Sequence, residues 1–324
     1  MTREEEWVLR EKYGGDASAA GFSEDCDRLA KGEPVAYVIG WQPFLGLKIR
    51  LDSKPLIPRP ETEWWTEQLF KETQRSGAER PEASAAERTA SPRAVAARVF
   101  EGGAGTVGHS DGRRAERGRV RRLAGAPTRL PDTPLREAPL RFLDLCAGSG
   151  AIGCAALARL PNARVYFGEL DPAHEPTIQK NIVLAAENAA SNAAGPREKG
   201  MIYHTLLARA DVRIGDLFEP FGDMTFDVIA CNPPYIPTDR ALDTSVTEYE
   251  PHEALFSGAD GLDLIRRLAR EMPLHLNPGG IAYVECDAMH AEAARGLFEA
   301  AGLAASVIPD QYGVPRVLVV RLQA

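Results

Sequence analysis

The sequence lacks any apolar run long enough to cross a bilayer, so we expect no membrane-spanning helix. Cysteine is also scarce: its five residues are odd in number, scattered, and never form a Cys-x-x-Cys pair. This usage argues against a disulfide framework or a metal site and favours reduced core thiols in an intracellular protein. The five residues are Cys26, Cys146, Cys154, Cys231 and Cys286.

An excess of positive charge is absent as well. The chain has 38 Lys and Arg against 46 Asp and Glu, a formal net charge of -8. Because proteins that bind nucleic acid through an extended surface are usually basic, we expect any contact with nucleic acid to be indirect. Residues 1–6 are acidic and have no apolar core, unlike a secretory signal or a typical Arg- and Ser-rich presequence.

The sequence does contain an alternation of buried strands and helices in its C-terminal part. We expect strands at residues 142–145, 164–169, 212–215, 226–230 and 281–285, the last one after a turn at 277–280. Helices are expected at residues 151–160, 177–192, 262–272 and 291–301. Residues 305–308 and 317–322 indicate a closing antiparallel hairpin. This order predicts an α/β fold with a doubly wound, mostly parallel, seven-stranded sheet.

The first 55 residues are expected to form a small helical cap and a hairpin, ahead of a larger domain over 56–324. Helices are predicted around residues 7–9 and 26–30. Residues 35–40 and 44–49 alternate in a way typical of strands, with Gly40 and Pro43 marking the turn between them. Pro60 is suited to begin the next helix.

The composition changes between residues 76 and 137. This stretch is rich in Ala, Arg, Gly, Ser and Pro, and Phe100 is its only aromatic residue. Its arginines outnumber its acids, so it is a basic region in an acidic protein. We predict a disordered insertion in the larger domain; the alternative is a basic arm that binds ribosomal RNA or a carrier surface.

The loop Asn232, Pro233, Pro234 and Tyr235 directly follows a hydrophobic strand. In open α/β sheets ligands bind at the carboxyl ends of strands. Proline removes backbone donors and leaves carbonyl acceptors, while Asn232 adds a side-chain carbonyl and Tyr235 an aromatic ring. Such a loop suits a planar NH2 group, because two acceptors bind its hydrogens and a ring packs on its plane. The other interpretation is a turn that ends a strand.

A glycine-rich loop follows the strand at 142–145. Its glycines let the backbone approach a ligand, but it lacks the lysine of a P-loop and the spacing of a dinucleotide fingerprint. S-adenosylmethionine, which has no phosphates, fits better; a structural turn is the alternative. The candidate residues are Asp144, Cys146, Ala147, Gly148, Ser149 and Gly150.

Two carboxylates follow the next two strands. Glu169 is placed to accept both ribose hydroxyls of a nucleoside, and Asp216 to bind an adenine amino group, with Leu217 packing on the ring. The alternatives are a surface acid before a turn for Glu169 and a helix-capping aspartate for Asp216.

Several stretches together resemble the HemK-type protein-(glutamine-N5) methyltransferases, which methylate peptide-chain release factors. The resemblance covers about residues 31–74 and 140–324. Its most specific part is Ile-Pro-Arg-Pro-Glu-Thr-Glu at 57–63, whereas Asn-Pro-Pro-Tyr is shared with adenine-N6 DNA methyltransferases. Residues 32–40, 215–220 and 250–255 match as well.

The resemblance implies the class I S-adenosylmethionine-dependent methyltransferase fold, with S-adenosylmethionine as cofactor and no metal. The glycine loop, Glu169, Leu217 and Asn232 would contact the cofactor. Residues 232–235 would hold the substrate glutamine, with Asn232, Pro233 and Tyr235 as the catalytic group.

Arg59, in the most specific stretch, is a further candidate for substrate binding. It either neutralises a carboxylate of the cofactor or partner, or pairs with Glu61 or Glu63.

Three departures from the family pattern are visible. The N-terminal helical domain is short, the insertion at 76–137 is foreign to bacterial members, and Cys286-Asp287 follows Glu285 where a glycine is usual. The insertion favours a mitochondrial protein over a cytoplasmic one, and we expect a monomer. The alternatives to a release-factor enzyme are a ribosomal-protein glutamine methyltransferase, an adenine-N6 DNA or RNA methyltransferase, and a cofactor-binding scaffold without turnover.

Overall fold

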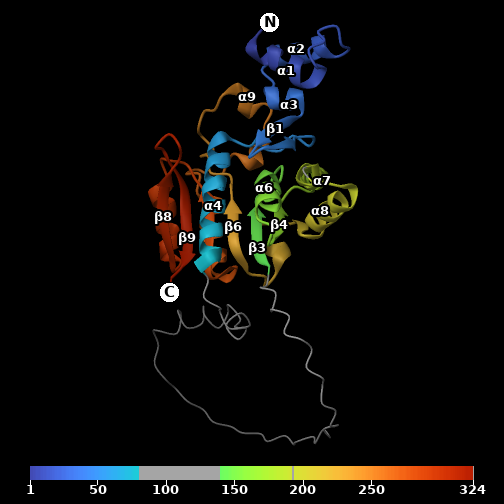
Figure 1. Ribbon diagram of the computed structural model, residues 1–324. Helices are drawn as coiled ribbons and strands as arrows, with labels where there is room; N and C mark the ends of the chain where they lie inside the picture. The colour runs from blue at the N-terminus through green and yellow to red at the C-terminus, as the bar shows by residue number, and fades with distance from the viewer. Residues whose placement is uncertain (80–138, 192, 324) are drawn as a thin grey trace, which may run out of the picture.

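A seven-stranded sheet forms the centre of the computed structural model, which describes residues 1–79, 139–191 and 193–323 (Figure 1). The strands are β3 (Leu140–Leu145), β4 (Ala163–Glu169), β5 (Ala210–Ile214), β6 (Phe226–Cys231), β7 (Leu276–Glu285), β8 (Leu303–Pro309) and β9 (Pro315–Leu322). Their order is β5-β4-β3-β6-β7-β9-β8, parallel from β5 to β7, with β9 antiparallel to both of its neighbours. The predicted doubly wound sheet and its closing hairpin are confirmed.

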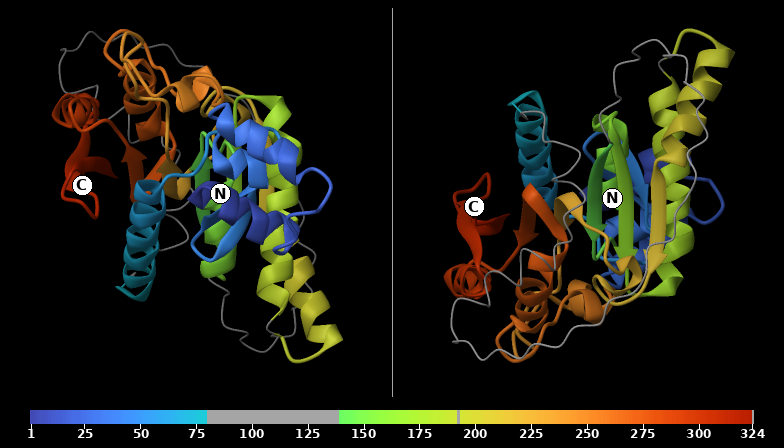
Figure 2. Two further views of the ribbon diagram at one scale, coloured as in Figure 1. Left: turned by 90° about the horizontal axis from the view of Figure 1, so that it is seen from above. Right: turned by 90° about the horizontal axis from the view of Figure 1, so that it is seen from below.

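The two faces of the sheet bury separate cores, because successive residues of a strand point to opposite faces. Phe142 and Val228 belong to the core under α4, α6, α7 and α8, whereas Leu143 and Ile229 belong to the core under α10 and α11. Figure 2 shows these two layers of helices on either side of the sheet. Their bounds are α4 (Pro60–Glu79), α6 (Ala151–Arg159), α7 (Glu175–Ser191), α8 (Pro196–Ala208), α10 (Asp263–Glu271) and α11 (Ala291–Ala300).

The N-terminal segment lies over the carboxyl ends of the parallel strands (Figure 1). It consists of α1 (Arg3–Tyr13), α2 (Phe22–Ala30), α3 (Val35–Ile39), β1 (Trp41–Phe44) and β2 (Leu47–Arg50). Thr2 precedes α1 in a capping box: the Thr2 hydroxyl accepts from the Glu5 amide, and the Glu5 carboxylate accepts from the Thr2 amide. The two helices predicted here are confirmed.

The predicted hairpin is placed wrongly in part. Residues 35–39 are not a strand but the helix α3, which begins after Pro34 and ends at Gly40 in the left-handed conformation. All four residues after Val35 are buried, and a short run buried on every side does not distinguish a strand from a helical turn. The hairpin is β1–β2, and its turn is Leu45-Gly46, both at positive φ.

Two other boundaries differ from prediction. The Asn-Pro-Gly-Gly stretch at 277–280 is not a turn before β7 but a bulge within it: the pairing jumps from Phe226↔Leu276 to Val228↔Ile281. Helix α4 continues to Glu79, so residues 76–79 are helical rather than disordered. The rest of the predicted insertion lies outside the described residues.

Short helical segments complete the connections between strands. These are η2 (Pro172–His174), η3 (Glu219–Phe221), α9 (Thr244–Thr247), η4 (His252–Ala254) and η5 (Met272–Leu274). Within the part of the chain that the structure covers, no helix is long and apolar enough to cross a membrane.

Candidate active site

The predicted site residues meet at the carboxyl edge of the sheet. Glu169 ends β4 and Asn232 follows β6, with β3 between these two strands. Neighbouring strands lie about 4.8 Å apart, so the backbones that carry the two side chains are separated by roughly 10 Å. The glycine loop leaves β3 at the same edge, between them.

The glycine loop and Glu169 are in direct contact. The Gly148 amide donates to Glu169 Oε2 at 2.7 Å, and the Asp171 amide donates to Oε1 at 2.9 Å. Gly148 and Gly150 have φ of 55° and 74°, in the left-handed region that a glycine reaches without strain. Asn181 of α7 donates to the Ser149 carbonyl at 2.9 Å and holds the loop against that helix.

Asp144 lies beneath this loop and is fully buried. Its Oδ2 accepts from the Gly153 amide at 2.8 Å, but its Oδ1 has no hydrogen-bond partner among the described residues. Burial raises the pKa of the Asp144 carboxyl well above its usual value. An unpartnered carboxylate oxygen beneath the glycine loop fits the amino group of S-adenosylmethionine, which brings donors.

Asp216, the acidic residue that follows β5, has an ion-pair partner that the sequence did not reveal. Arg267 of α10 donates to Asp216 Oδ2 at 2.9 Å, so one oxygen remains for an adenine amino group. Leu217 is buried at φ 47°, and Cys146 has φ 60°; both are non-glycine residues in a conformation that is concentrated at functional sites. Leu170, beside Glu169, is an exposed large apolar side chain at 60%.

The Asn-Pro-Pro-Tyr loop is fixed from both sides. The Ile236 amide donates to the Leu255 carbonyl at 2.9 Å, and the Tyr235 hydroxyl donates to Glu285 Oε1 at 2.9 Å. At its start, Cys231 Sγ lies 3.9 Å from Cys146 Sγ in the glycine loop. The end of β6, from which the Asn-Pro-Pro-Tyr loop (the acceptor loop, residues 232–235) leaves, therefore contacts the start of the glycine loop.

Glu285 is a buried carboxylate at the end of β7 that the sequence analysis left without a role. Its Oε2 accepts from Thr62 Oγ1 and from Trp65 Nε1, each at 2.7 Å, and both donors come from α4. Burial raises its pKa, while the hydrogen bonds from Trp65, Thr62 and Tyr235 oppose that rise. Asn232 Nδ2 donates to Thr62 Oγ1 at 3.3 Å, so the most specific stretch of the sequence reaches the acceptor loop through Thr62.

Arg59 has a different partner from the two acids considered. It pairs with Glu250 Oε1 at 2.5 Å, not with Glu61 or Glu63. Glu250 is buried, and its Oε2 accepts from the Ile57 amide at 3.1 Å. The ion pair ties the segment before α4 to the segment after α9.

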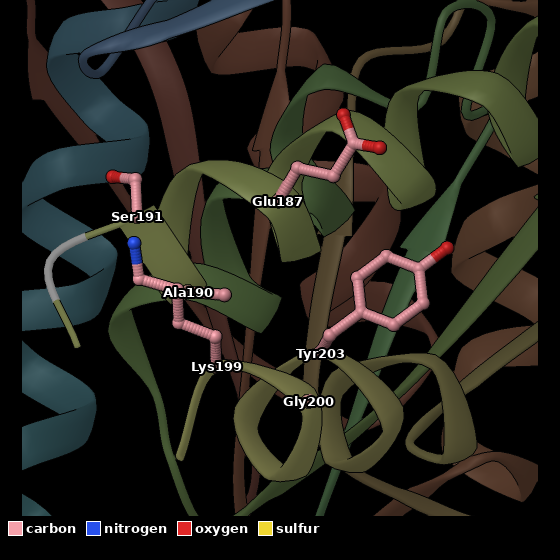
Figure 3. Close-up of a pocket in the computed structure, with 6 residues that line it drawn as sticks. All are labelled: Glu187, Ala190, Ser191, Lys199, Gly200 and Tyr203. Atoms are coloured by element: carbon pink, nitrogen blue, oxygen red, sulfur yellow. The ribbon is translucent and has the colours of Figure 1, made fainter. Parts of the chain in front are cut away.

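Neither of two surface hollows is lined by the glycine loop, Glu169 or the Asn-Pro-Pro-Tyr loop. Figure 3 shows one between α7 and α8, which contains none of the predicted site residues. The other lies between the N-terminal helices and α9 and includes Arg59 and Glu250. No cluster of His, Cys, Asp and Glu suited to a metal ion occurs in residues 1–79, 139–191 and 193–323.

This fold, with a glycine loop, a strand-end carboxylate and an Asn-Pro-Pro-Tyr loop at one edge, belongs to the class I S-adenosylmethionine-dependent methyltransferases. A family model described as "Conserved hypothetical protein 95" matches residues 136–259. Release factor glutamine methyltransferase from Geobacter sulfurreducens is 31% identical over 294 residues, which is 90% of this chain and 74% of the relative. The chain belongs to the release factor glutamine methyltransferase family.

One further relative and one solved structure are similar to shorter parts of the chain. Release factor glutamine methyltransferase from Cereibacter sphaeroides is 38% identical over 198 residues, 60% of this chain and 64% of the relative. A solved methyltransferase from Pyrococcus furiosus is 18% identical with a TM-score of 0.36, covering 56% of this chain and 74% of that one.

Proposed function

We propose that this chain methylates the side-chain amide nitrogen of the glutamine in the Gly-Gly-Gln motif of a peptide chain release factor. The observation that carries the proposal is that two loops leave the neighbouring strands β3 and β6 side by side at one edge of the sheet. One loop, at 146–150, is bonded to the carboxylate of Glu169, and the other, at 232–235, begins directly after Cys231, whose Sγ lies 3.9 Å from Cys146 Sγ. The names of the relatives in the family support the same substrate.

S-adenosylmethionine supplies an electrophilic methyl group when it is bound. The amides and carbonyls of the glycine loop, Asp144 and Glu169 are the groups that would hold it. The remaining acidic residue, Asp216, has one oxygen free of Arg267 for the adenine.

The task of the acceptor loop is to make an amide nitrogen reactive. That nitrogen is a poor nucleophile because its lone pair is delocalised into the carbonyl. Asn232 Oδ1 and the Pro233 carbonyl would each accept one of its N–H bonds, which orients the nitrogen and stabilises positive charge as it develops. Positioning of this kind supplies about 7–11 kcal/mol in favourable cases. After the methyl group is transferred, the positively charged nitrogen is strongly acidic and releases one N–H proton to water, so the attack itself requires no titratable base. The ring of Tyr235, held by Glu285, would pack on the plane of the amide.

The deciding experiment is transfer of a labelled methyl group to a recombinant release factor. We expect labelling of the factor that carries Gly-Gly-Gln and none of the same factor with that glutamine replaced. Labelling that survives the replacement, or that appears only on a ribosomal protein or on nucleic acid, would overturn the proposal.

The compartment and the oligomeric state remain predictions. We propose a mitochondrial location, on the basis of the basic stretch at 76–137 that the resemblance marks as foreign to bacterial members. We also propose that the protein is a monomer. Fractionation of cells that produce the tagged protein would check its compartment. The mass of the purified protein, measured by light scattering, would check its oligomeric state.

A further inference from the structure

A hydrogen-bond chain joins a buried carboxylate to the acceptor loop. Glu285 Oε2 receives the indole N–H of Trp65, which can only donate, and the hydroxyl of Thr62. With its proton directed to Glu285, Thr62 Oγ1 presents a lone pair to Asn232. The group of Asn232 that faces Thr62 must then be the NH2, at 3.3 Å.

The donor-to-acceptor direction of these hydrogen bonds determines whether Asn232 presents its NH2 group or its Oδ1 atom to a substrate. A carboxamide has one donor end and one acceptor end, and the two are similar in shape. If the NH2 is bonded to Thr62, the Oδ1 atom points away from α4 and is the end available to a substrate N–H. If the amide turned over, a donor would face the N–H bonds of the glutamine and no hydrogen bond would form.

We propose that Glu285, acting through Thr62, sets the orientation of the Asn232 carboxamide, and that Glu285 and Thr62 are positioning residues for methyl transfer. The inference rests on the proposed function. Glu285 also accepts the Tyr235 hydroxyl, so one buried group orients both ends of the acceptor loop. Thr62 comes from α4, Asn232 and Tyr235 from the loop after β6, and Glu285 from the end of β7. These three segments are far apart in the sequence.

The test replaces Thr62 with valine, which keeps the shape and removes the hydroxyl. We expect kcat to fall about tenfold or more, less than the roughly 100- to 1000-fold loss typical of a direct contact. The KM for the release factor and the affinity for S-adenosylmethionine should change little. Thr62→Ser restores the hydroxyl and should restore kcat.

Thr73→Val is the matched control. Thr73 is also a buried threonine of α4, and its hydroxyl donates to the Leu69 carbonyl at 2.8 Å, away from the acceptor loop. The Thr73→Val variant should lose about as much stability as Thr62→Val, but its kcat should stay that of the unaltered protein. Equal kcat values for the two valine variants, or a serine variant that stays as slow as Thr62→Val, would overturn the inference.

A second readout does not need an active enzyme. In protein labelled with 15N-asparagine, the side-chain amide signal of Asn232 is identified by its loss in Asn232→Asp. We expect this signal to shift in Thr62→Val and in Glu285→Gln, but not in Thr62→Ser or Thr73→Val. An unmoved signal overturns the inference even if the release factor is not the substrate, whereas a failed methyl transfer by the unaltered protein concerns only the proposed function.

Discussion

Asn232 is the residue on which the proposed chemistry depends most directly. Replacing it with alanine removes one acceptor from the amide nitrogen, and such a contact is worth about 3–4 kcal/mol in the transition state. We expect kcat for release-factor methylation to fall about 100- to 1000-fold, measured by single-turnover transfer of a labelled methyl group.

Asn188→Ala is the control for that variant. Asn188 is exposed on α7 and lies outside the predicted site. The Asn188→Ala variant should therefore methylate the release factor at the same rate as the unaltered protein. Normal methylation by Asn232→Ala would remove this residue from the mechanism.

Glu33 carries a pH dependence that belongs to the N-terminal segment. The Arg28 guanidinium donates to both of its oxygens at 2.8 Å and Lys54 adds a third bond, which lowers the pKa of Glu33 from 4.5 to about 2. Because the folded-state pKa is the lower one, the carboxylate stabilises the fold above pH 4.5. This contribution, at most about 3 kcal/mol, is lost as the pH falls towards 2.

The corresponding variant is Glu33→Gln. We expect it to be less stable than the unaltered protein at pH 7, with a difference that shrinks between pH 4.5 and pH 2, measured by urea unfolding. Glu24→Gln, on the exposed side of α2, should show no such trend. A constant difference at all pH values would show that the ion pair is not its cause.

At the scale of single residues, the sequence was informative where the function lies on consecutive residues. Gly148, Glu169 and Asn232 were identified because a loop follows a strand end in each case. Thr62 and Glu285 were not paired, because 223 positions separate them and no local pattern links a helix to a distant strand end. The Arg59–Glu250 pair was missed for the same reason.

At the scale of elements, periodicity predicted the strands of the sheet and failed where burial has no period. Helix α3 was taken for a strand because its residues are buried on all sides. Helix α8 was not predicted, since it buries only Leu206 and contains Gly200. The bulge of β7 carries the Pro-Gly-Gly composition of a turn, and only its pairing with β6 shows that the strand continues through it.

Helix α6 packs so closely on the sheet that adding one methyl group to its glycine should change the stability of the protein. A Cβ at Gly153 would lie 2.2 Å from the ring of Phe167, which is fully buried. We expect Gly153→Ala to lower the free energy of unfolding by about 1–3 kcal/mol, although alanine is the better helix former. Chemical denaturation measures this.

Gly296→Ala is the matched control in α11. A Cβ there meets no atom within 4 Å, so the same substitution should raise the stability by about 0.4–1 kcal/mol. If both variants were stabilised, the close contact of α6 with β4 would not be rigid.

At the scale of the whole molecule, the site and the two residues that flank positions 80–138 lie at opposite edges of the sheet. Thr62 at the start of α4 contacts the acceptor loop, whereas α4 ends and β3 begins at the other edge of the sheet (Figure 1). We expect a protein in which a flexible linker of about 20 residues replaces residues 80–138 to methylate a release factor at a rate within about twofold of the unaltered chain.

The methylation rate of this shortened protein separates a protein methyltransferase from a nucleic-acid methyltransferase. A tenfold or greater loss of methyl transfer with an unchanged melting temperature would mean that the basic stretch binds the substrate, as a nucleic-acid enzyme would require. Melting temperature and methyl transfer are measured on the same preparation.

The join between α4 and β3 also bears on how such a chain can change over many generations. A segment that leaves and re-enters the sheet at its amino-terminal edge can lengthen or shorten with little selective penalty, since neither loop of the reaction centre is displaced. The same gain of sequence at the opposite edge, after β4 or β6, would be removed by selection.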